Sequence, residues 1–148
     1  MGDAPDIDGA FLTRLGLKDG RRLGLVRAPE AWFRTLERLA PVDAAPSPAR
    51  AKKAGVLLVW LEQSDNLRRV FAALEKKIPP DGAVWAVIPK KSALAKGESA
   101  VAWHDMQAAG LASGRLVDNK ELRFDDRYYG TRFVVRVAAR ASGRKEHR

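Results

Sequence analysis

Apolar residues along this chain follow two patterns, short continuous runs and stripes at helical spacing. Residues 56–61 and 83–88 are apolar at every position, which is typical of strands in the middle of a parallel sheet, covered on both faces. In residues 22–27, Leu23 and Leu25 alternate with smaller or polar residues, which favours a third strand. A short strand around Val42 is also predicted, within a proline-rich stretch that is otherwise a loop.

Segments with helical spacing follow these strands. The first contains apolar residues at helical intervals after a proline suited to the first helical position: Pro29, Trp32, Phe33, Leu36 and Leu39. The second follows Ser64, a predicted helix cap, and places its apolar residues at i, i+3, i+4, i+7 and i+11: Leu67, Val70, Phe71, Leu74 and Ile78. A third helix is predicted from about Ser99, with its end near Gly114 and three residues on one face: Trp103, Met106 and Gly110.

The last third of the chain predicts a hairpin. Two strands, 116–124 and 132–137, are joined by the polar and aromatic segment 125–130. Strands and helices alternate before this hairpin, so the fold class is α/β, a single doubly wound and mostly parallel sheet. Helices are expected on both faces, and the C-terminal hairpin should contain one antiparallel strand.

Length and composition indicate one globular domain. The chain has 148 residues, of which 46% are hydrophobic and 30% charged. We predict a lead-in at 1–15, the α/β domain at 16–139, and a basic, disordered tail at 140–148. The chain has no cysteine, which excludes disulfides, thiolate metal sites and a cysteine nucleophile.

We expect neither a secretory signal nor a membrane-spanning segment in this sequence. Three aspartates precede the first basic residue, and the longest strongly apolar runs fall far short of 18 residues. A cytoplasmic protein with no membrane partner is therefore expected.

Several short motifs together resemble one bacterial protein family. They are the segments 15–18, 28–30, 56–61, 80–82, 89–91, 116–120 and 132–136, together with Gly130. The sequence resembles the domain-of-unknown-function family numbered three thousand and fifty-two, over most of residues 15–137. The resemblance implies a trimmed sheet similar to that of S-adenosylmethionine-dependent methyltransferases, and it supplies no activity or catalytic residue. Arg27 stands where family members commonly have glycine, and Tyr128 where they commonly have tryptophan.

The residues of the turn after the first strand indicate whether a methyltransferase cofactor could bind there. Methyltransferases resemble one another in a glycine-rich turn there, because the backbone must approach the cofactor closely. Residues 25–30 contain no glycine and include Arg27 and Pro29, and Asp43 is the single candidate for the acid that would hold the ribose. We therefore expect a degenerate methyltransferase-like domain that binds an anionic ligand or partner without catalysis and without a cofactor. The alternative is an S-adenosylmethionine-dependent methyltransferase with an atypical turn.

No other catalytic or metal constellation is visible. The nucleophile-elbow, phosphate-loop and dinucleotide glycine motifs are all absent from the sequence. The chain has two histidines, His104 and His147. We interpret His104 as a surface or packing residue and expect no metal site. We interpret Asp125 and Asp126 as part of a turn with local ion pairing.

A candidate anion-binding edge lies where ligands of this architecture bind, outside the carboxyl ends of the strands. Lys90 and Lys91 follow a buried strand there, and Glu62 and Arg27 should share the edge. The competing interpretation is that the two lysines are simply solvated, as loop residues commonly are. An anionic small molecule is the ligand class this edge predicts.

The net charge of +9 raises a further alternative, nonspecific binding of nucleic acid. The segment 140–148 carries four basic residues and one acidic residue, so +6 remains on residues 1–139. Basic residues recur as pairs at 21–22, 52–53, 68–69, 76–77 and 90–91. Tyr128 and Tyr129 are the aromatic residues expected to be exposed, and no base-reading module is visible.

Overall fold

The computed structural model describes residues 5–137, which form six strands and four α-helices with two short 3-10 helices. The strands are β1 (Leu23–Val26), β2 (Val42–Ala45), β3 (Val56–Trp60), β4 (Ala83–Pro89), β5 (Leu116–Arg123) and β6 (Tyr128–Val135). The helices are α1 (Gly9–Leu15), α2 (Glu30–Glu37), η1 (Pro48–Arg50), α3 (Leu67–Glu75), η2 (Lys91–Ala93) and α4 (Trp103–Leu111). None of the helices in this part of the chain is long and apolar enough to cross a membrane.

The strands form one sheet with the order β2-β1-β3-β4-β6-β5. The strands β1 to β4 pair in parallel, and β6 runs antiparallel to both of its neighbours, β4 and β5. The predicted fold class is confirmed, including the single antiparallel strand of the C-terminal hairpin. The predicted tail at 140–148 lies outside the described residues.

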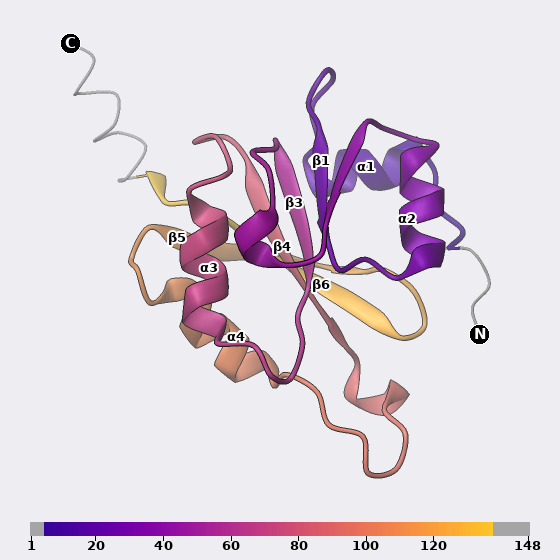
Figure 1. Cartoon of the computed structure of the whole chain (residues 1–148), viewed down its shortest axis with the longest axis vertical. Helices are drawn as coiled ribbons and strands as arrows, with labels where there is room; N and C mark the ends of the chain where they lie inside the picture. Colours follow the sequence, from indigo (N-terminus) through magenta and orange to yellow (C-terminus); the bar gives the residue numbers. More distant parts are fainter. Residues whose placement is uncertain (1–4, 138–148) are drawn as a thin grey trace.

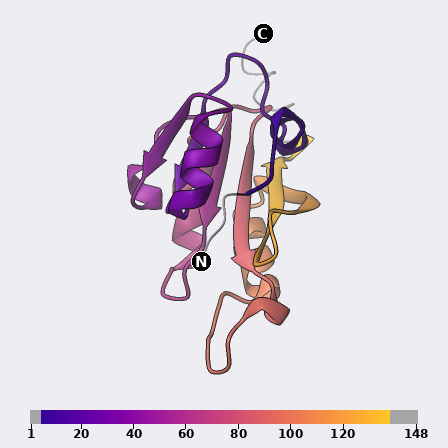
Figure 2. The same cartoon turned by 90° about the vertical axis from the view of Figure 1, so that its right-hand side faces the viewer.

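Strands β3 and β4 are covered on both faces, as their continuous apolar sequences predict. Val56, Leu58 and Trp60 belong to the core on one face, whereas Leu57 and Val59 belong to the core on the other. Helices α1 and α2 cover the first face, and α3 and α4 cover the second (Figure 1). Figure 2 shows the loop between β4 and α4 projecting past the end of the sheet toward which β4 points.

Helix α1 occupies part of the segment predicted to be a lead-in, and local signals accompany it. The Asp8 side chain accepts a hydrogen bond from the Ala10 backbone N–H, and Gly16 ends the helix with a φ of 87°. Phe11 and Leu15 are buried, and the Leu15 carbonyl accepts a hydrogen bond from the Trp85 indole at 2.9 Å. The helix is therefore packed against the sheet.

Several predicted boundaries are wrong because tertiary contacts decide them. Strand β6 begins at Tyr128 and not at residue 132, since it pairs with the whole length of β4 as far as Pro89. Asn66 caps α3 in place of Ser64, accepting a hydrogen bond from the Arg69 N–H. Pro29 is the N-cap of α2 and not its first helical residue, and α4 begins at Trp103 and not near Ser99. Strand β6 ends at Val135, and Val137, the predicted last residue of this strand, is 71% exposed.

The contact between α4 and β6 predicts a large effect of adding a side chain at Gly110. An added Cβ would lie 2.3 Å from Cε2 of Phe133. We expect Gly110→Val to lower the free energy of unfolding by about 2–3 kcal/mol through overpacking. Urea unfolding measures the change, with Gly9→Val as the matched control, since nothing lies within 4 Å of a Cβ there and the expected effect is under about 0.5 kcal/mol. Equal losses in the two variants would contradict the packing argument.

Candidate functional site

The order of the strands reverses between β1 and β3, and this switch point identifies the candidate site. Strand β1 pairs with β2 on one side and with β3 on the other. Open α/β sheets bind ligands at such a point, outside the carboxyl ends of the strands. Arg27 directly follows β1, and Glu62 lies two residues after the end of β3. The structure thus brings together two of the four predicted site residues.

The Arg27 side chain lies across this switch point between two carboxylates. Its Nη1 is 2.6 Å from Oε1 of Glu62, and its Nη2 is 2.9 Å from Oδ2 of Asp65. Asp65 also accepts a hydrogen bond from the Glu62 backbone N–H at 2.8 Å. Burial alone would lower the pKa of Arg27, but the hydrogen bonds and charges of Asp65 and Glu62 outweigh it and raise the pKa above its usual value. Arg27 is therefore a fixed cation.

The backbone at Arg27 is unusual. Its φ is 61°, and it is the one non-glycine residue with positive φ in the part of the chain that the structure describes. Glycine adopts this conformation without steric cost, whereas other residues are strained there. Glycine would therefore be the residue expected at this position on backbone grounds alone. Here the two ion pairs hold an arginine in the same conformation.

An open cavity of ≈ 570 Å³ lies beside this cluster. Its lining includes both charged and aromatic side chains: Arg27, Trp60, Glu62, Glu98, Arg127 and Tyr128. Arg127 Nη2 is 2.6 Å from Oε2 of Glu98, and this hydrogen bond lowers the pKa of Glu98 and raises that of Arg127. Two basic and two acidic side chains thus line the cavity, in paired contacts. The charge balance does not favour an anion over a neutral ligand.

Two buried polar atoms near the cavity have no hydrogen-bond partner among the described residues. They are Nε1 of Trp60 and Nε of Arg27. Both are donors, so a ligand or water that reached them would have to offer an acceptor.

Lys90 and Lys91 follow β4 at the same edge but do not line the cavity. The backbone N–H of Lys90 donates to the Arg127 carbonyl at 2.8 Å, and Lys91 is exposed at the start of η2. The two lysines therefore follow Pro89, which lines the cavity, and form no ion pair with Glu62. Their role in binding an anion stays a prediction.

Asp43 does not lie where a ribose-binding acid would be needed. It is the second residue of β2, which ends at Ala45, and it therefore lies toward the amino end of the sheet. Its Oδ2 is 2.6 Å from Nε of Arg22, and this hydrogen bond lowers the pKa of Asp43. Together with the side chain of Arg27 in the first turn, this placement means that the residues do not fit an adenosyl cofactor in the methyltransferase manner.

The remaining predicted candidates have structural roles. His104 is exposed on α4, with its ring 5.5 Å from that of Trp103. Asp125 accepts hydrogen bonds from the backbone N–H groups of Arg127 and Tyr128, and from the Trp32 indole at 2.8 Å. No group of three potential ligands among histidine, cysteine, aspartate and glutamate occurs within residues 5–137.

Sequence reasoning missed Asp65. The available signal was an acidic residue in the loop after a buried strand, the same signal that selected Glu62. Asp65 and Arg27 are 38 positions apart, so their pairing depends on strand order. Without the sheet topology, nothing distinguishes Asp65 from an ordinary helix-preceding aspartate.

Comparisons with known proteins reveal the fold of this chain and no family. No family model and no curated protein matches it. It is similar to the N-methyltransferase NodS from Bradyrhizobium japonicum WM9, with 15% identity over 86% of this chain and 93% of that one, and a TM-score of 0.53. A TehB-like SAM-dependent methyltransferase from Corynebacterium glutamicum ATCC 13032 Kitasato gives 9% identity, coverage of 88% and 89%, and a TM-score of 0.54.

A third solved structure is the ribosomal protein L11 methylase from Lactobacillus delbrueckii subsp. bulgaricus. It shares 10% identity over 86% of this chain and 76% of that one, with a TM-score of 0.52. At these identities the likeness establishes the fold alone, which is methyltransferase-like. Membership of the domain-of-unknown-function family stays a prediction.

The two carboxylates that hold Arg27 should contribute unequally to stability. The Asp65 side chain is 13% exposed, whereas that of Glu62 is 59% exposed and more strongly screened by solvent. We expect Asp65→Asn to lower the free energy of unfolding by about 1–3 kcal/mol. For Glu62→Gln the expected loss is at most about 0.5 kcal/mol. Urea unfolding at pH 7 measures both, and a larger loss for Glu62→Gln would contradict this assignment.

Proposed function

We propose that this chain is a methyltransferase-like domain that binds an anionic ligand or partner and does not transfer methyl groups. The observation that supports the proposal is the position of Arg27. Its side chain is held by Glu62 and Asp65 and occupies the turn after the first strand. Methyltransferases resemble one another in a glycine-rich turn at this place, which lets the backbone approach the cofactor closely. A cofactor approaching this turn in the usual way would meet a guanidinium group and its two carboxylates.

Displacing Arg27 would be costly. The side chain is 13% exposed and makes charge-assisted hydrogen bonds to both carboxylates. Hydrogen bonds to charged groups each contribute roughly 1.5–3 kcal/mol, and removing Arg27 would leave the Asp65 carboxylate without its cationic partner. An adenosyl ligand would have to offset this cost before it gained any binding energy. Fixed side chains at this point therefore favour a role without the cofactor.

The charge of the chain supports an anionic partner. The net charge is +9, and most of it lies outside the paired cluster around the cavity. A positive excess of this size attracts polyanions over distances set by the ionic strength. Lys90 and Lys91 at the carboxyl edge remain one candidate for the contact, with a small carboxylate or phosphate as its ligand.

A thermal-shift titration tests the absence of the cofactor. We expect neither S-adenosylmethionine nor S-adenosylhomocysteine to raise the melting temperature of the wild-type protein at millimolar concentration. A ligand that binds the folded state at 100 times its Kd adds about 2.7 kcal/mol of stability, which such a titration detects readily. Stabilisation of the wild-type protein by these two compounds would overturn the proposal in favour of a methyltransferase with an atypical turn.

Arg27→Gly serves as the matched variant in the same titration. Glycine accepts the positive φ at this position, so the backbone turn should persist while the side chain is removed. If Arg27 is what excludes the cofactor, this variant gains a shift with S-adenosylhomocysteine that the wild type lacks. Circular dichroism confirms that the variant is folded.

A further inference from the structure

Basic side chains from three separate loops meet at the amino ends of the parallel strands, the edge opposite the candidate site. The loops contain residues 20–22, 53–55 and 76–79, and together they line a cavity of ≈ 460 Å³. Half of its lining residues are basic: Arg21, Arg22, Lys53, Lys76 and Lys77. No acidic side chain belongs to the described lining. Residues from three of the five basic pairs in the sequence therefore converge.

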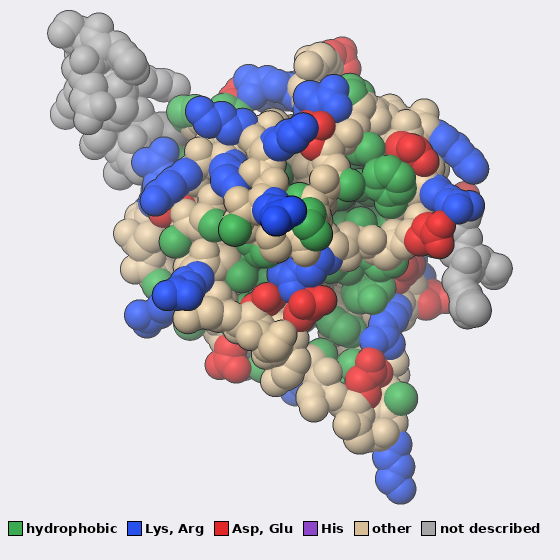
Figure 3. All heavy atoms as spheres, viewed as in Figure 1, with side chains coloured by type: hydrophobic (Ala, Val, Ile, Leu, Met, Phe, Trp, Pro, Cys, Tyr) green, Lys and Arg blue, Asp and Glu red, His purple; other side chains and the backbone are tan. Residues whose placement is uncertain are grey.

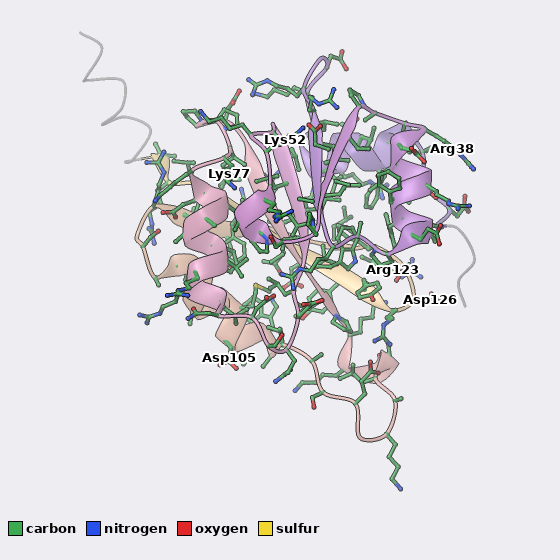
Figure 4. The ribbon with its side chains drawn as sticks, in the orientation of Figure 1. Arg38, Lys52, Lys77, Asp105, Arg123 and Asp126 are labelled. Carbon is green, nitrogen blue, oxygen red and sulfur yellow. The ribbon has the colours of Figure 1, made fainter. Side chains whose placement is uncertain are left out.

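We define the amino-edge surface as the seven basic residues of these loops and their neighbours: Lys18, Arg21, Arg22, Lys52, Lys53, Lys76 and Lys77. In Figure 3, Lys and Arg side chains gather over the end of the molecule where these loops lie, with few acidic side chains among them. Lys52 and Lys77 lie at this end in Figure 4, whereas Asp105 and Asp126 lie toward the other.

Backbone hydrogen bonds hold the three loops in fixed positions. The N–H of Gly55 donates to the Arg22 carbonyl at 3.0 Å, and the N–H of Ala54 donates to the Lys77 carbonyl at 2.9 Å. Gly55 also permits a close approach, because a Cβ there would lie 2.8 Å from Cβ of Arg21. The basic side chains therefore project from a preorganised surface, which reduces the conformational entropy lost on binding.

The acidic residues at this edge are fewer than the basic ones and leave a positive excess. Asp81 pairs with Lys18 at 2.7 Å and with Arg21 at 3.4 Å, and Asp43 pairs with Arg22. The Lys18 hydrogen bond lowers the pKa of Asp81, so this carboxylate is ionised at neutral pH. With Asp19 and Glu75, the sequence neighbours of Lys18 and Lys76, included, seven basic and four acidic residues leave a net charge of +3.

The positively charged residues of the amino-edge surface that form no ion pair are all lysines. Lys52, Lys53 and Lys76 make no ion pair within residues 5–137. The Lys77 ammonium donates to the carbonyls of Pro48 and Ala49 at 3.3 and 3.0 Å, which orients it and leaves its charge uncompensated. Four ammonium groups are thus available to an external anion. A lysine ammonium is a compact charge well suited to phosphate.

Strand β6 also ends at this edge, because it runs antiparallel to β4 and its Val134 pairs with Ala83. The sequence that follows Val137 has four basic residues and one acidic residue. The chain therefore leaves the described domain beside the amino-edge surface.

We propose that the amino-edge surface binds the phosphate backbone of duplex nucleic acid without reading its bases. The inference rests on the proposed function in that the domain binds an anionic partner, and it names that partner and its surface. Cations distributed over several loops match a row of phosphates better than one small anion. No aromatic side chain belongs to the cavity lining, so stacking on unpaired bases is not provided for. Tyr128 and Tyr129 pair with the carboxyl end of β4, at the far edge.

Fluorescence anisotropy with the full chain and a labelled 20-base-pair DNA duplex of mixed sequence tests the proposal. Four phosphate contacts predict a slope of about −3.6 in a plot of log K against log salt concentration. Affinity should therefore fall roughly 150-fold between 50 and 200 mM salt. A second duplex of unrelated sequence should bind equally well, because phosphate contacts carry no sequence information.

Two double variants separate the edges of the sheet. Lys52→Ala/Lys53→Ala and Arg68→Ala/Arg69→Ala each remove two positive charges, the first from the amino-edge surface and the second from the first turn of α3, which follows the carboxyl end of β3. The first should flatten the slope by about 2 and weaken binding about 60-fold at 100 mM salt. The second should retain the wild-type slope. Unchanged binding by the first variant, or equal losses in both, would overturn the assignment to the amino-edge surface.

Other polyanions distinguish failure of this inference from failure of the proposed function. Tighter binding of single-stranded DNA of equal length, or equal binding of poly-glutamate, would overturn the duplex assignment while leaving an anionic partner in place. Absence of binding to DNA, poly-glutamate and polyphosphate at 50 mM salt would overturn both. Residues 52, 53, 68 and 69 are exposed, so an unchanged melting temperature confirms that the variants are folded.

Discussion

The burial of β3 and β4 on both faces is the constraint on which the rest of the structure depends. Every residue from Val56 to Trp60, and from Ala83 to Ile88, is at most 5% exposed. A charged side chain in either strand would lose its hydration without a partner, which costs far more than a buried apolar contact returns. Charged residues are therefore absent from these two central strands and lie in the loops at their ends, on the helices and in the outer strands. The sheet acquires two edges that can differ in chemistry.

The two edges differ in how many of their positively charged side chains form ion pairs with carboxylates. At the carboxyl edge the cations of the cavity meet carboxylates, as Arg27 meets Glu62 and Asp65 and as Arg127 meets Glu98. At the amino edge, lysines outnumber the available acids, and Lys77 is oriented by carbonyl groups alone. Paired charges stabilise and position a loop, whereas unpaired charges attract an external partner. Charge pairing thus distinguishes the cavity at the carboxyl edge from the amino-edge surface.

The methyltransferase-like fold leaves the function open, because function resides in sites and one fold supports several. The turn after β1 shows how a site can change while the fold is retained. A residue with a φ of 61° is the natural place for glycine, yet Arg27 occupies it and is held by ion pairs on both of its Nη atoms. A backbone conformation that suits glycine is therefore combined here with a bulky, ion-paired side chain.

The sequence by itself determined the elements whose apolar pattern is strong. The buried strands β3 and β4, the apolar stripe of α3 and the C-terminal hairpin followed from spacing alone, because periodicity reflects which faces are covered. Helix α1 escaped notice since its seven residues bury only Phe11 and Leu15, although Asp8 and Gly16 were available as end signals. The start of β6 also escaped, because pairing with β4 extends the strand through polar residues.

Only the tertiary structure decided which charges meet. Arg27 was predicted to offer its charge to a ligand, and the structure commits it to Asp65, 38 positions away. Conversely, the sequence did not place the basic pairs of separate loops relative to one another, and residues of three pairs line one cavity. Coulomb energies depend on distance in space and on local burial, and neither can be read from position along the chain. Strand order supplies both, so the chemistry of the two edges became visible only after the sheet was assembled.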